Sequence, residues 1–537
     1  MNYAQIINNE ELSFDINLSN AYQYNNKQIL EWTTEALKIP LNDFEGVDSS
    51  NMNFPLIAVK LIIQKMFPLT GIPVFSRIKL SNISISEKQT CKLIIQKIDL
   101  ISVQHYLEII KFSIEALNWM SKNAMTSKTI EYFYGTYLPS IIKPIKSIYR
   151  PGDSTIDILY NAFLKQIPYT NLGQDIYQLG WGSKGRIIKG STTDNDATIG
   201  RRLANNKFTS ALLLLSAGLP GTKNVIVKNM KEAINAASLF GYPVVVKPPI
   251  DTARGDGVVM DVMNRDMLND AFSYTQKFIK DKSVLIEKQE DGIVHRILIY
   301  KGELLAIYEK IGTYIEGNGE DNVENLINKK NNSIKLMPPW GREKTIKKDI
   351  PTFYAMKTTG HNLKKIPESG EKICVQRIGS SNVGGEQADV AKVVHSENID
   401  LAIRVSKLFK LDHCGIDFIT KDITKPWHTN NAKIIEVNLG PSLFASEVAN
   451  LAIPDFISGL IEGDGKIPIE FNSNIEDALI FQKENQHKNK RVYIVTKKEV
   501  LAPTNKPIFI QNTDIKIRIK SLLLNNEVDH IIVVEDN

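Results

Sequence analysis

Two segments far apart in the sequence carry side chains suited to phosphate and metal chemistry. The first, GYPVVVKPP (241–249), has the pattern of a buried strand that ends at Lys247, and a turn containing Gly255 and Gly257 follows it. A lysine at the end of a rigid strand offers a point charge to a phosphate, and the amides of a glycine-bearing turn fold over phosphate oxygens. No GxxxxGK[ST] pattern occurs, so this is not a P-loop. For an isolated VVVKP, a surface lysine after a core strand is the better interpretation.

The second segment, IIEVNLGPS (434–442), places Glu436 and Asn438 on one face of a strand, because strand side chains alternate with a period of two. Asp417 lies upstream in CGIDFIT. Magnesium prefers carboxylates together with phosphate oxygens and water, so these three residues are candidate magnesium ligands. A strand with a polar, solvent-facing side is the alternative, but a carboxylate inside the apolar IIEV needs a partner.

Two further cations, Arg296 and Lys207, are either ordinary surface charges or side chains that face a cleft closed by a lid. No Ser/His/Asp order and no Cys/His pair indicates covalent catalysis. Five histidines lack metal-ligand spacing: His295, His361, His395, His413 and His428. They are better interpreted as side chains whose hydrogen bonds are satisfied within the protein or by solvent.

Composition narrows the class of protein. The chain has 537 residues, a net charge of +5 and interspersed acidic and basic residues, which argues against a dedicated nucleic-acid or membrane surface. Three scattered cysteines indicate neither a disulfide framework nor a zinc knuckle. No signal peptide and no apolar run of membrane-spanning length is visible, so a cytoplasmic enzyme is expected.

Patterning predicts three parts: an N-terminal α/β or α-rich domain (1–150), a central domain (151–460) and a small α/β appendage (461–537). Residues 91–121 have helix-like spacing of apolar residues. The central domain is predicted to contain a compact α+β lid over about 225–310, which ends in a hairpin at 295–310. The polar stretch 311–370 is expected to be a mobile or irregular connection.

The ordered motifs resemble the ATP-grasp superfamily, and within it the cyanophycin synthetase branch. The resemblance covers about residues 150–460 and includes QLGWGSKGRIIKGSTTDNDATIGRRLANNKFTSALLLLSAGLP, GYPVVVKP, VLIEKQEDGIVHRILIYKGELLAIYEKIGTYIEGNGEDNVENLI, SSNVGGE, CGIDFIT and IIEVNLGPS. It implies an α/β (α+β) ATP-grasp fold and an ATP-dependent carboxylate–amine ligase with two magnesium ions.

The resemblance also assigns residues to roles. Lys207 and Lys247 match nucleotide-phosphate lysines, the 252–257 turn matches the phosphate-covering loop, and Arg296 matches the arginine near the γ-phosphate and acyl phosphate. The other matched residues are Arg254, Gly255 and Gly257 in that turn, Glu287, Lys288 and Gln289 in the hinge that lines the adenine, Asp417, Glu436 and Asn438 as magnesium ligands, and Ser380, Ser381, Gly384 and Gly385 beside the acceptor carboxylate.

Three departures from the family's pattern stand out. Val294 replaces an acidic residue near the ribose, and Asp256 replaces a basic residue in the phosphate loop. Residues 466–482 occupy the place where cyanophycin synthetases continue into a Mur-ligase-like domain with a second P-loop. A single ligation is therefore expected rather than alternating additions to a polymer.

The expected activity is ATP-driven formation of an amide or peptide bond on an amino acid or peptide, through an acyl phosphate, with release of ADP and phosphate. A glutamate–cysteine-type or natural-product peptide ligase shares this chemistry and stays open. A non-catalytic ATP-binding module is the alternative of another class. The expected partners are a small-molecule or peptide substrate and copies of the chain in a homodimer or tetramer, without nucleic acid or membrane.

Overall fold

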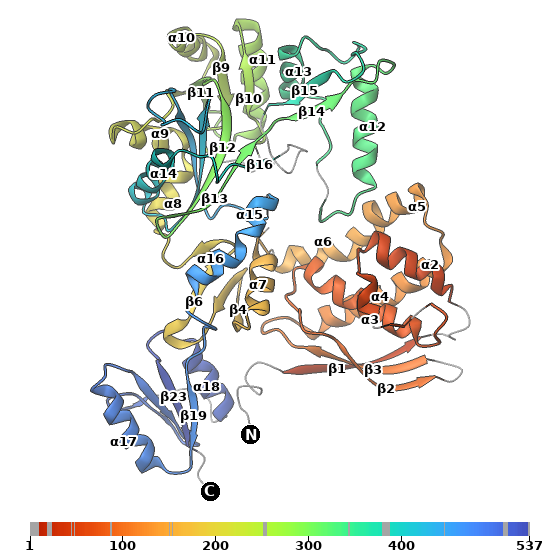
Figure 1. Ribbon diagram of the computed structural model, residues 1–537, viewed down its shortest axis with the longest axis vertical. Helices are drawn as coiled ribbons and strands as arrows, with labels where there is room; N and C mark the ends of the chain where they lie inside the picture. Colours follow the sequence, from red (N-terminus) through yellow and green to blue (C-terminus); the bar gives the residue numbers. More distant parts are fainter. Residues whose placement is uncertain are drawn as a thin grey trace. The chain divides into compact units, whose positions relative to one another are not determined.

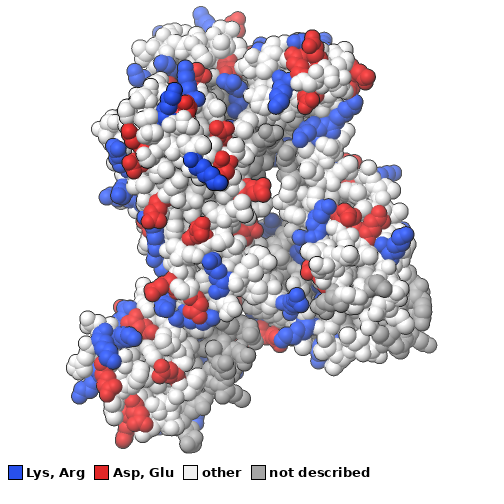
Figure 2. Space-filling view, viewed as in Figure 1, with Lys and Arg blue, Asp and Glu red and all other residues white. Residues whose placement is uncertain are grey.

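The structure is a computed structural model that describes residues 10–18, 24–44, 46–47, 49–85, 89–149, 151–152, 154–250, 255–341, 344–377, 387–444, 446–508 and 514–534. The chain divides into two compact units: Met1–Gly190 with Ile457–Asn537, and Ser191–Phe456. Lysine, arginine and acidic side chains are interspersed over the visible surface (Figure 2). No helix in the described ranges is long and apolar enough to span a membrane.

The N-terminal part of the first unit is an antiparallel sheet of order β1-β3-β2, with helices packed beside it (Figure 1). Residues 91–121, whose pattern is helix-like, divide into a strand and a helix. Every second residue of QTCKLIIQ is buried, so these residues pair as a strand, and the helix begins only after the Ser102 cap. The elements are β1 (Glu11–Leu18), β2 (Lys79–Ile85), β3 (Gln89–Gln96), α2 (Asn26–Glu31), α3 (Phe54–Thr70), α4 (Val103–Lys122), α5 (Ser127–Tyr132) and α6 (Leu138–Tyr149).

Residues 154–189 add α7 (Thr155–Leu164), β4 (Tyr169–Gly173), β5 (Ile176–Leu179) and β6 (Arg186–Lys189) to this unit. Strand β5 pairs antiparallel with both β4 and β6. The chain reverses between β5 and β6 at Gly182–Lys184.

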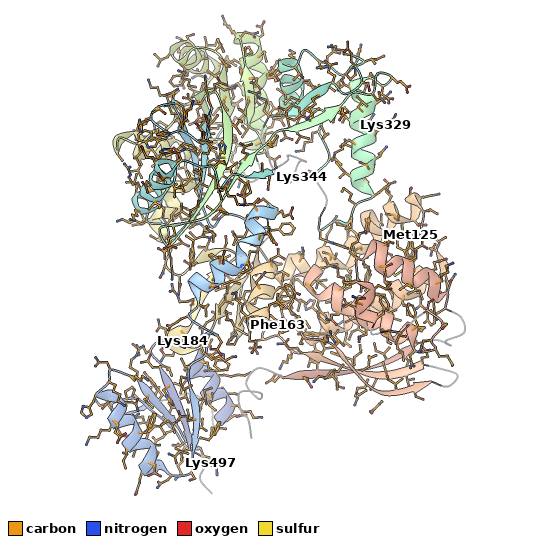
Figure 3. All side chains as sticks on the ribbon, viewed as in Figure 1. Met125, Phe163, Lys184, Lys329, Lys344 and Lys497 are labelled. Atoms are coloured by element: carbon orange, nitrogen blue, oxygen red, sulfur yellow. The ribbon has the colours of Figure 1, made fainter. Side chains whose placement is uncertain are left out.

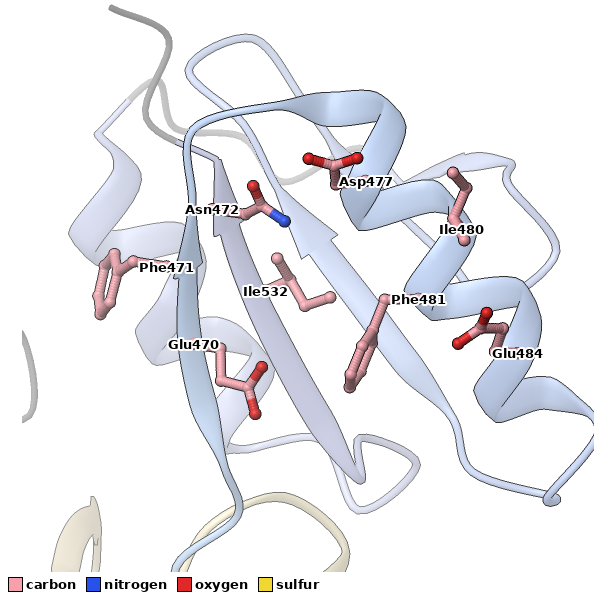
Figure 4. Close-up of a pocket in the computed structure, with 8 residues that line it drawn as sticks. All are labelled: Glu470, Phe471, Asn472, Asp477, Ile480, Phe481, Glu484 and Ile532. Atoms are coloured by element: carbon pink, nitrogen blue, oxygen red, sulfur yellow. The ribbon is translucent and has the colours of Figure 1, made fainter.

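The C-terminal appendage is a five-stranded sheet of order β19-β23-β20-β21-β22, with two helices packed on it. A groove of about 320 Å³ opens between β19 and α17, and Figure 4 shows Ile532 and Phe481 at its centre. The elements are β19 (Ile469–Asn472), α17 (Ile475–Gln486), β20 (Val492–Val495), β21 (Val500–Leu501), β22 (Pro507–Ile508), α18 (Ile515–Leu523) and β23 (His530–Val534).

The second unit begins with a four-stranded sheet of order β10-β9-β11-β8. All four residues of β9 are buried, because its β-branched valines pack on α10 and α11. Gly241 ends α10 in the left-handed region at φ +75°, so the chain turns directly into β9. The elements are β8 (Asn224–Val227), α10 (Met230–Phe240), β9 (Val244–Lys247), β10 (Val259–Val262), α11 (Arg265–Thr275) and β11 (Val284–Lys288).

A five-stranded sheet of order β16-β13-β12-β17-β18 forms the other layer of this unit. Its apolar face packs on α14 through Phe409, Val405 and Ile416. The predicted hairpin at 295–310 is confirmed, but the proposed lid boundary at 310 is wrong: β12 pairs with β17 along its whole length, so the hairpin belongs to this sheet and not to the β8–β11 sheet. The elements are α8 (Thr198–Asn205), α9 (Lys207–Ser216), β12 (Ile293–Tyr300), β13 (Glu303–Lys310), β16 (Gln387–Asp389), α14 (Ser396–Phe409), β17 (His413–Thr420), β18 (Lys433–Leu439) and α15 (Glu447–Leu451).

The stretch 311–370 contains regular elements among its described residues and is not the irregular connection that its polar composition predicted. The segment 311–376 holds the two-stranded sheet of β14 (Thr313–Glu316) and β15 (Lys372–Gln376), with α12 (Val323–Lys335) and α13 (Ile350–Thr358). A small core of its own includes Val323, Ile327 and Ile373. Lys329, labelled in Figure 3, projects from the polar side of α12 and pairs with Asp321 at 2.5 Å. Sparse but correctly spaced apolar residues are therefore enough to order this insertion.

Candidate functional site

Lys247 is fixed at the end of β9 by a buried ion pair. Its Nζ lies 2.7 Å from Oε1 of Glu287 on the neighbouring strand β11, and the two residues are 4% and 3% exposed. The other carboxylate oxygen of Glu287 accepts a hydrogen bond of 2.7 Å from the Thr222 hydroxyl. An ammonium has three N–H donors, so the bond to Glu287 uses one of them. The arrangement holds a preoriented cation at the strand end, as a phosphate site needs.

Asp417 is surrounded by two cations on the face of the five-stranded sheet. Arg296 is its register partner on β12, and Arg296 Nε lies 2.8 Å from Asp417 Oδ1. Lys310, at the end of β13, places its Nζ 3.2 Å from Asp417 Oδ2. Gly415 keeps room for the guanidinium, because a Cβ there would lie 2.6 Å from an Arg296 nitrogen. Arg296, expected from the sequence, and Lys310, which the sequence prediction missed, thus share one carboxylate.

Glu436 faces Asp417 across β17 and β18, and its carboxylate lies 2.8 Å from Lys207 Nζ. Burial raises the pKa of Glu436, but the charges of Lys207, Lys247 and Arg296 outweigh it and lower the pKa to about 2. Lys207 begins α9, and its main-chain N–H donates to Pro249 O just after β9. Cations from α9, β9 and β12 thus lower the pKa of this one carboxylate, although only Lys207 is bonded to it.

The predicted magnesium ligands lie on two adjacent strands of one sheet, β17 and β18. Asn438 pairs with Gly415 two residues beyond the Glu436–Asp417 pair, and its amide nitrogen is buried without a hydrogen-bond partner among the described residues. No group of three or more His, Cys, Asp or Glu side chains suited to a metal occurs in the described ranges. Two carboxylates and one amide fit a magnesium ion whose remaining ligands are phosphate oxygens and water.

The hinge after β11 differs from the sequence expectation in where its side chains point. Glu287 turns to Lys247, and the Gln289 side chain is bonded to Asp261, so neither side chain is directed to an adenine. Lys288 is exposed, and its main-chain N–H donates to Lys223 O at 3.0 Å.

The phosphate turn is described only in part. Gly255 and Gly257 have φ values of +76° and +83°, a backbone conformation that favours glycine. Asp256, in the position where a basic residue is common, pairs with Lys347 at 3.2 Å. Val294, the other departure, lies opposite Lys310 in the β12–β13 ladder. The predicted residues Arg254, Ser380, Ser381, Gly384 and Gly385 lie outside the described residues.

The groove on the appendage does not suit a nucleotide. Glu470, Asp477 and Glu484 line it, and its described lining contains no lysine or arginine (Figure 4). Carboxylates repel a triphosphate, whereas the sheet faces of the second unit present cations.

Comparisons with known proteins identify relatives by sequence. No protein-family model matches the chain. It is 30% identical to the cyanophycin synthetase of Geminocystis herdmanii over 305 residues. These residues make up 56% of this chain and 35% of the relative. The chain is 26% identical to the glutathione biosynthesis bifunctional protein of Clostridium perfringens over 301 residues. These residues make up 54% of this chain and 38% of that protein.

The chain thus spans little more than a third of the length of these curated relatives. Among solved structures, a bifunctional glutathione synthetase from Pasteurella multocida aligns with 66% of this chain and 53% of its own, at 19% identity and a TM-score of 0.40. Over 56% of its length the chain is thus similar in sequence to the cyanophycin synthetases, and its mixed helices and sheets have the α/β architecture that the ATP-grasp resemblance predicts.

Proposed function

We propose that the protein is an ATP-dependent carboxylate–amine ligase that joins an amino acid or peptide to an amine through an acyl phosphate. One observation carries the proposal: four cations from four separate elements, Lys207, Lys247, Arg296 and Lys310, are held by the carboxylates of Glu436, Glu287 and Asp417. A site that transfers a phosphoryl group needs positioned positive charge of this kind, because charge is spread over the phosphate oxygens in the transition state.

The chain's own residues act by positioning and by charge. Lys247, held by Glu287, and Lys207, at the start of α9, receive phosphate oxygens of ATP. Arg296 and Lys310 neutralise the charge that develops as the substrate carboxylate attacks the γ-phosphate in line. An amine then attacks the acyl phosphate, a C–N bond forms, and phosphate leaves. No protein nucleophile takes part.

Asp417, Glu436 and Asn438 would hold magnesium in this site. When bound, the metal supplies charge neutralisation on the phosphate oxygens. Asp417 is bonded to Arg296 and Lys310, and Glu436 to Lys207, so the residues that would hold the metal lie beside the cations that would bind phosphate oxygens.

The finer features of the proposal rest on the resemblance. Two magnesium ions, a cytoplasmic location and a homodimer or tetramer are proposed with the ligase. The same proposal divides the chain into an N-terminal part of about 150 residues, an ATP-grasp part that ends at about residue 460, and the appendage. Ser380, Ser381, Gly384 and Gly385 are proposed to border the acceptor carboxylate, and Arg254 to belong to the phosphate turn.

The test is ADP formation from ATP and magnesium over a panel of amino acids and short acidic peptides. A rise in ADP with one carboxylate and one amine together, and a product mass equal to their sum minus water, supports the ligase. Asp417→Ala and Glu436→Ala should abolish ADP formation with the fold retained by circular dichroism. Full activity in either variant contradicts the metal assignment. Nucleotide binding with no ADP over the whole panel favours the non-catalytic module.

A further inference from the structure

Asp261 has an unusual environment for an acidic residue. It lies in β10 at an irregularity between Val259 and Val262, where the register with β9 shifts. Its φ is +56°, and it is 5% exposed. Asp and Asn tolerate this left-handed conformation better than most residues. Bulges of this kind redirect a side chain, and here the carboxylate is turned into the protein.

Two separate elements bind this one side chain. The Asp261 main-chain N–H donates to Gln289 Oε1 at 2.7 Å, and Gln289 Nε2 donates to Asp261 Oδ1 at 2.8 Å. The second oxygen, Oδ2, lies 3.2 Å from Nε of Arg377. Gln289 belongs to the hinge that follows β11, and Arg377 follows β15 of the inserted segment 311–376. Asp261 therefore connects the hinge to the insertion.

The connection borders the phosphate turn. Asp261 and Arg377 line one pocket together with Gly255 and Gly257. A buried carboxylate needs a compensating charge, and Arg377 is the cation that the structure places on it. Loss of Arg377 leaves that charge uncompensated, and the Gln289 bonds on the other oxygen then lose their fixed acceptor.

We propose that Asp261 is a positioning residue that couples the nucleotide hinge to the insertion, so that nucleotide affinity depends on Arg377. The inference rests on the proposed function for the identity of the hinge. A hinge held by Asp261 is preorganised, whereas a loose hinge must be ordered when the nucleotide binds. Coupling between two sites typically changes affinity 5- to 150-fold, and we expect at least about a 5-fold loss here.

Four variants separate the two arms of the connection. Asp261→Asn keeps a residue that tolerates the left-handed backbone but removes the charge that holds Arg377. Arg377→Gln removes the cation alone, and Arg377→Lys should restore part of the effect. Gln289→Leu removes the hinge arm. Lys372→Gln is the matched control, because Lys372 is an exposed cation at the start of the same strand, β15.

The first measurement is the dissociation constant of a fluorescent ADP analogue with magnesium and without acceptor. At a temperature where every variant is folded by circular dichroism, Arg377→Gln and Asp261→Asn should weaken binding at least about 5-fold, and Lys372→Gln should not. In the Gln289→Leu background, Arg377→Gln should have no further effect. Additive effects of these two substitutions, or wild-type affinity in Arg377→Gln, overturn the coupling.

The second measurement needs no nucleotide. Hydrogen–deuterium exchange of the hinge peptide 284–292 should be faster in Arg377→Gln and Asp261→Asn than in the wild type or in Lys372→Gln. Unchanged exchange overturns the coupling whether or not ADP binds. Faster exchange in a protein that binds no ADP supports the coupling and contradicts the proposed ligase, so the two failures are distinguishable.

Discussion

The buried Lys247–Glu287 pair predicts a sharp difference between a single and a double substitution. In Glu287→Leu the ammonium of Lys247, on a residue that is 4% exposed, loses its counter-charge, and the Thr222 hydroxyl loses its acceptor. Removing one partner of a buried pair costs about 3–5 kcal/mol. In Lys247→Met/Glu287→Leu both charges are replaced by apolar groups of similar volume, and most of that loss should return.

Hydrogen exchange of the β9 and β11 amides measures this loss of stability at the two strands themselves. Since a factor of ten corresponds to about 1.4 kcal/mol, Glu287→Leu should speed exchange at Val246 and Ile286 by roughly 150-fold to 5,000-fold. The double variant should exchange within about tenfold of the wild type but should not bind the ADP analogue. Glu303→Leu, at an exposed position on β13 in the other sheet, is the control and should leave both strands unchanged.

Two results would refute the reasoning. Wild-type exchange in Glu287→Leu would mean that Lys247 reaches water and is not sealed in the sheet. Equal damage in the single and double variants would mean that the loss comes from packing around Glu287 and not from an uncompensated charge.

Other predictions concern the second half of the site. Because the pKa of Glu436 falls to about 2 on folding, its pair with Lys207 stabilises the fold above its ordinary pKa of about 4.5, and this stabilisation is lost as the pH falls toward 2. Glu436→Gln should therefore show a weaker dependence of unfolding on pH in that window; an acid-unfolding profile identical to the wild type contradicts the pairing. Lys310→Met should lower the rate of ADP formation by about 10²-fold with the affinity for the ADP analogue nearly retained, and an unchanged rate rules out its proposed role.

Local patterns predicted many of the elements. The β-branched run before Lys247 gives β9. The hairpin at 295–310 was also predicted, but its sheet was not. Arg296 pairs with Asp417, which is 121 residues away in the sequence, and strand composition does not encode such a partner. The insertion was missed because its core is small and its surface is polar.

The site was predictable where a residue's type and its strand position were both informative. Asp417, Glu436 and Asn438 are polar residues in apolar strands, and the structure places them on adjacent strands. Lys310 is also a charged residue at the end of a largely apolar strand, on the same strand face as Tyr308. It stands beside another charge in YEK, and the sequence prediction did not include it. Gln289 was expected to face the nucleotide, but the bulge at Asp261 takes its side chain instead.

Residue types and their spacing were enough to predict which chemical groups this protein uses. These are lysines at the ends of rigid elements, carboxylates and an amide on alternating strand positions, and glycines in a phosphate turn. These follow from residue type and from the short periods of strands and helices. Only the tertiary structure decided which charges meet. Lys207 reaches Glu436, Lys247 reaches Glu287, and Asp261 joins Gln289 to Arg377, because strand pairing and bulges bring distant segments together. Such contacts depend on register and packing, which the spacing of residues along one segment does not specify.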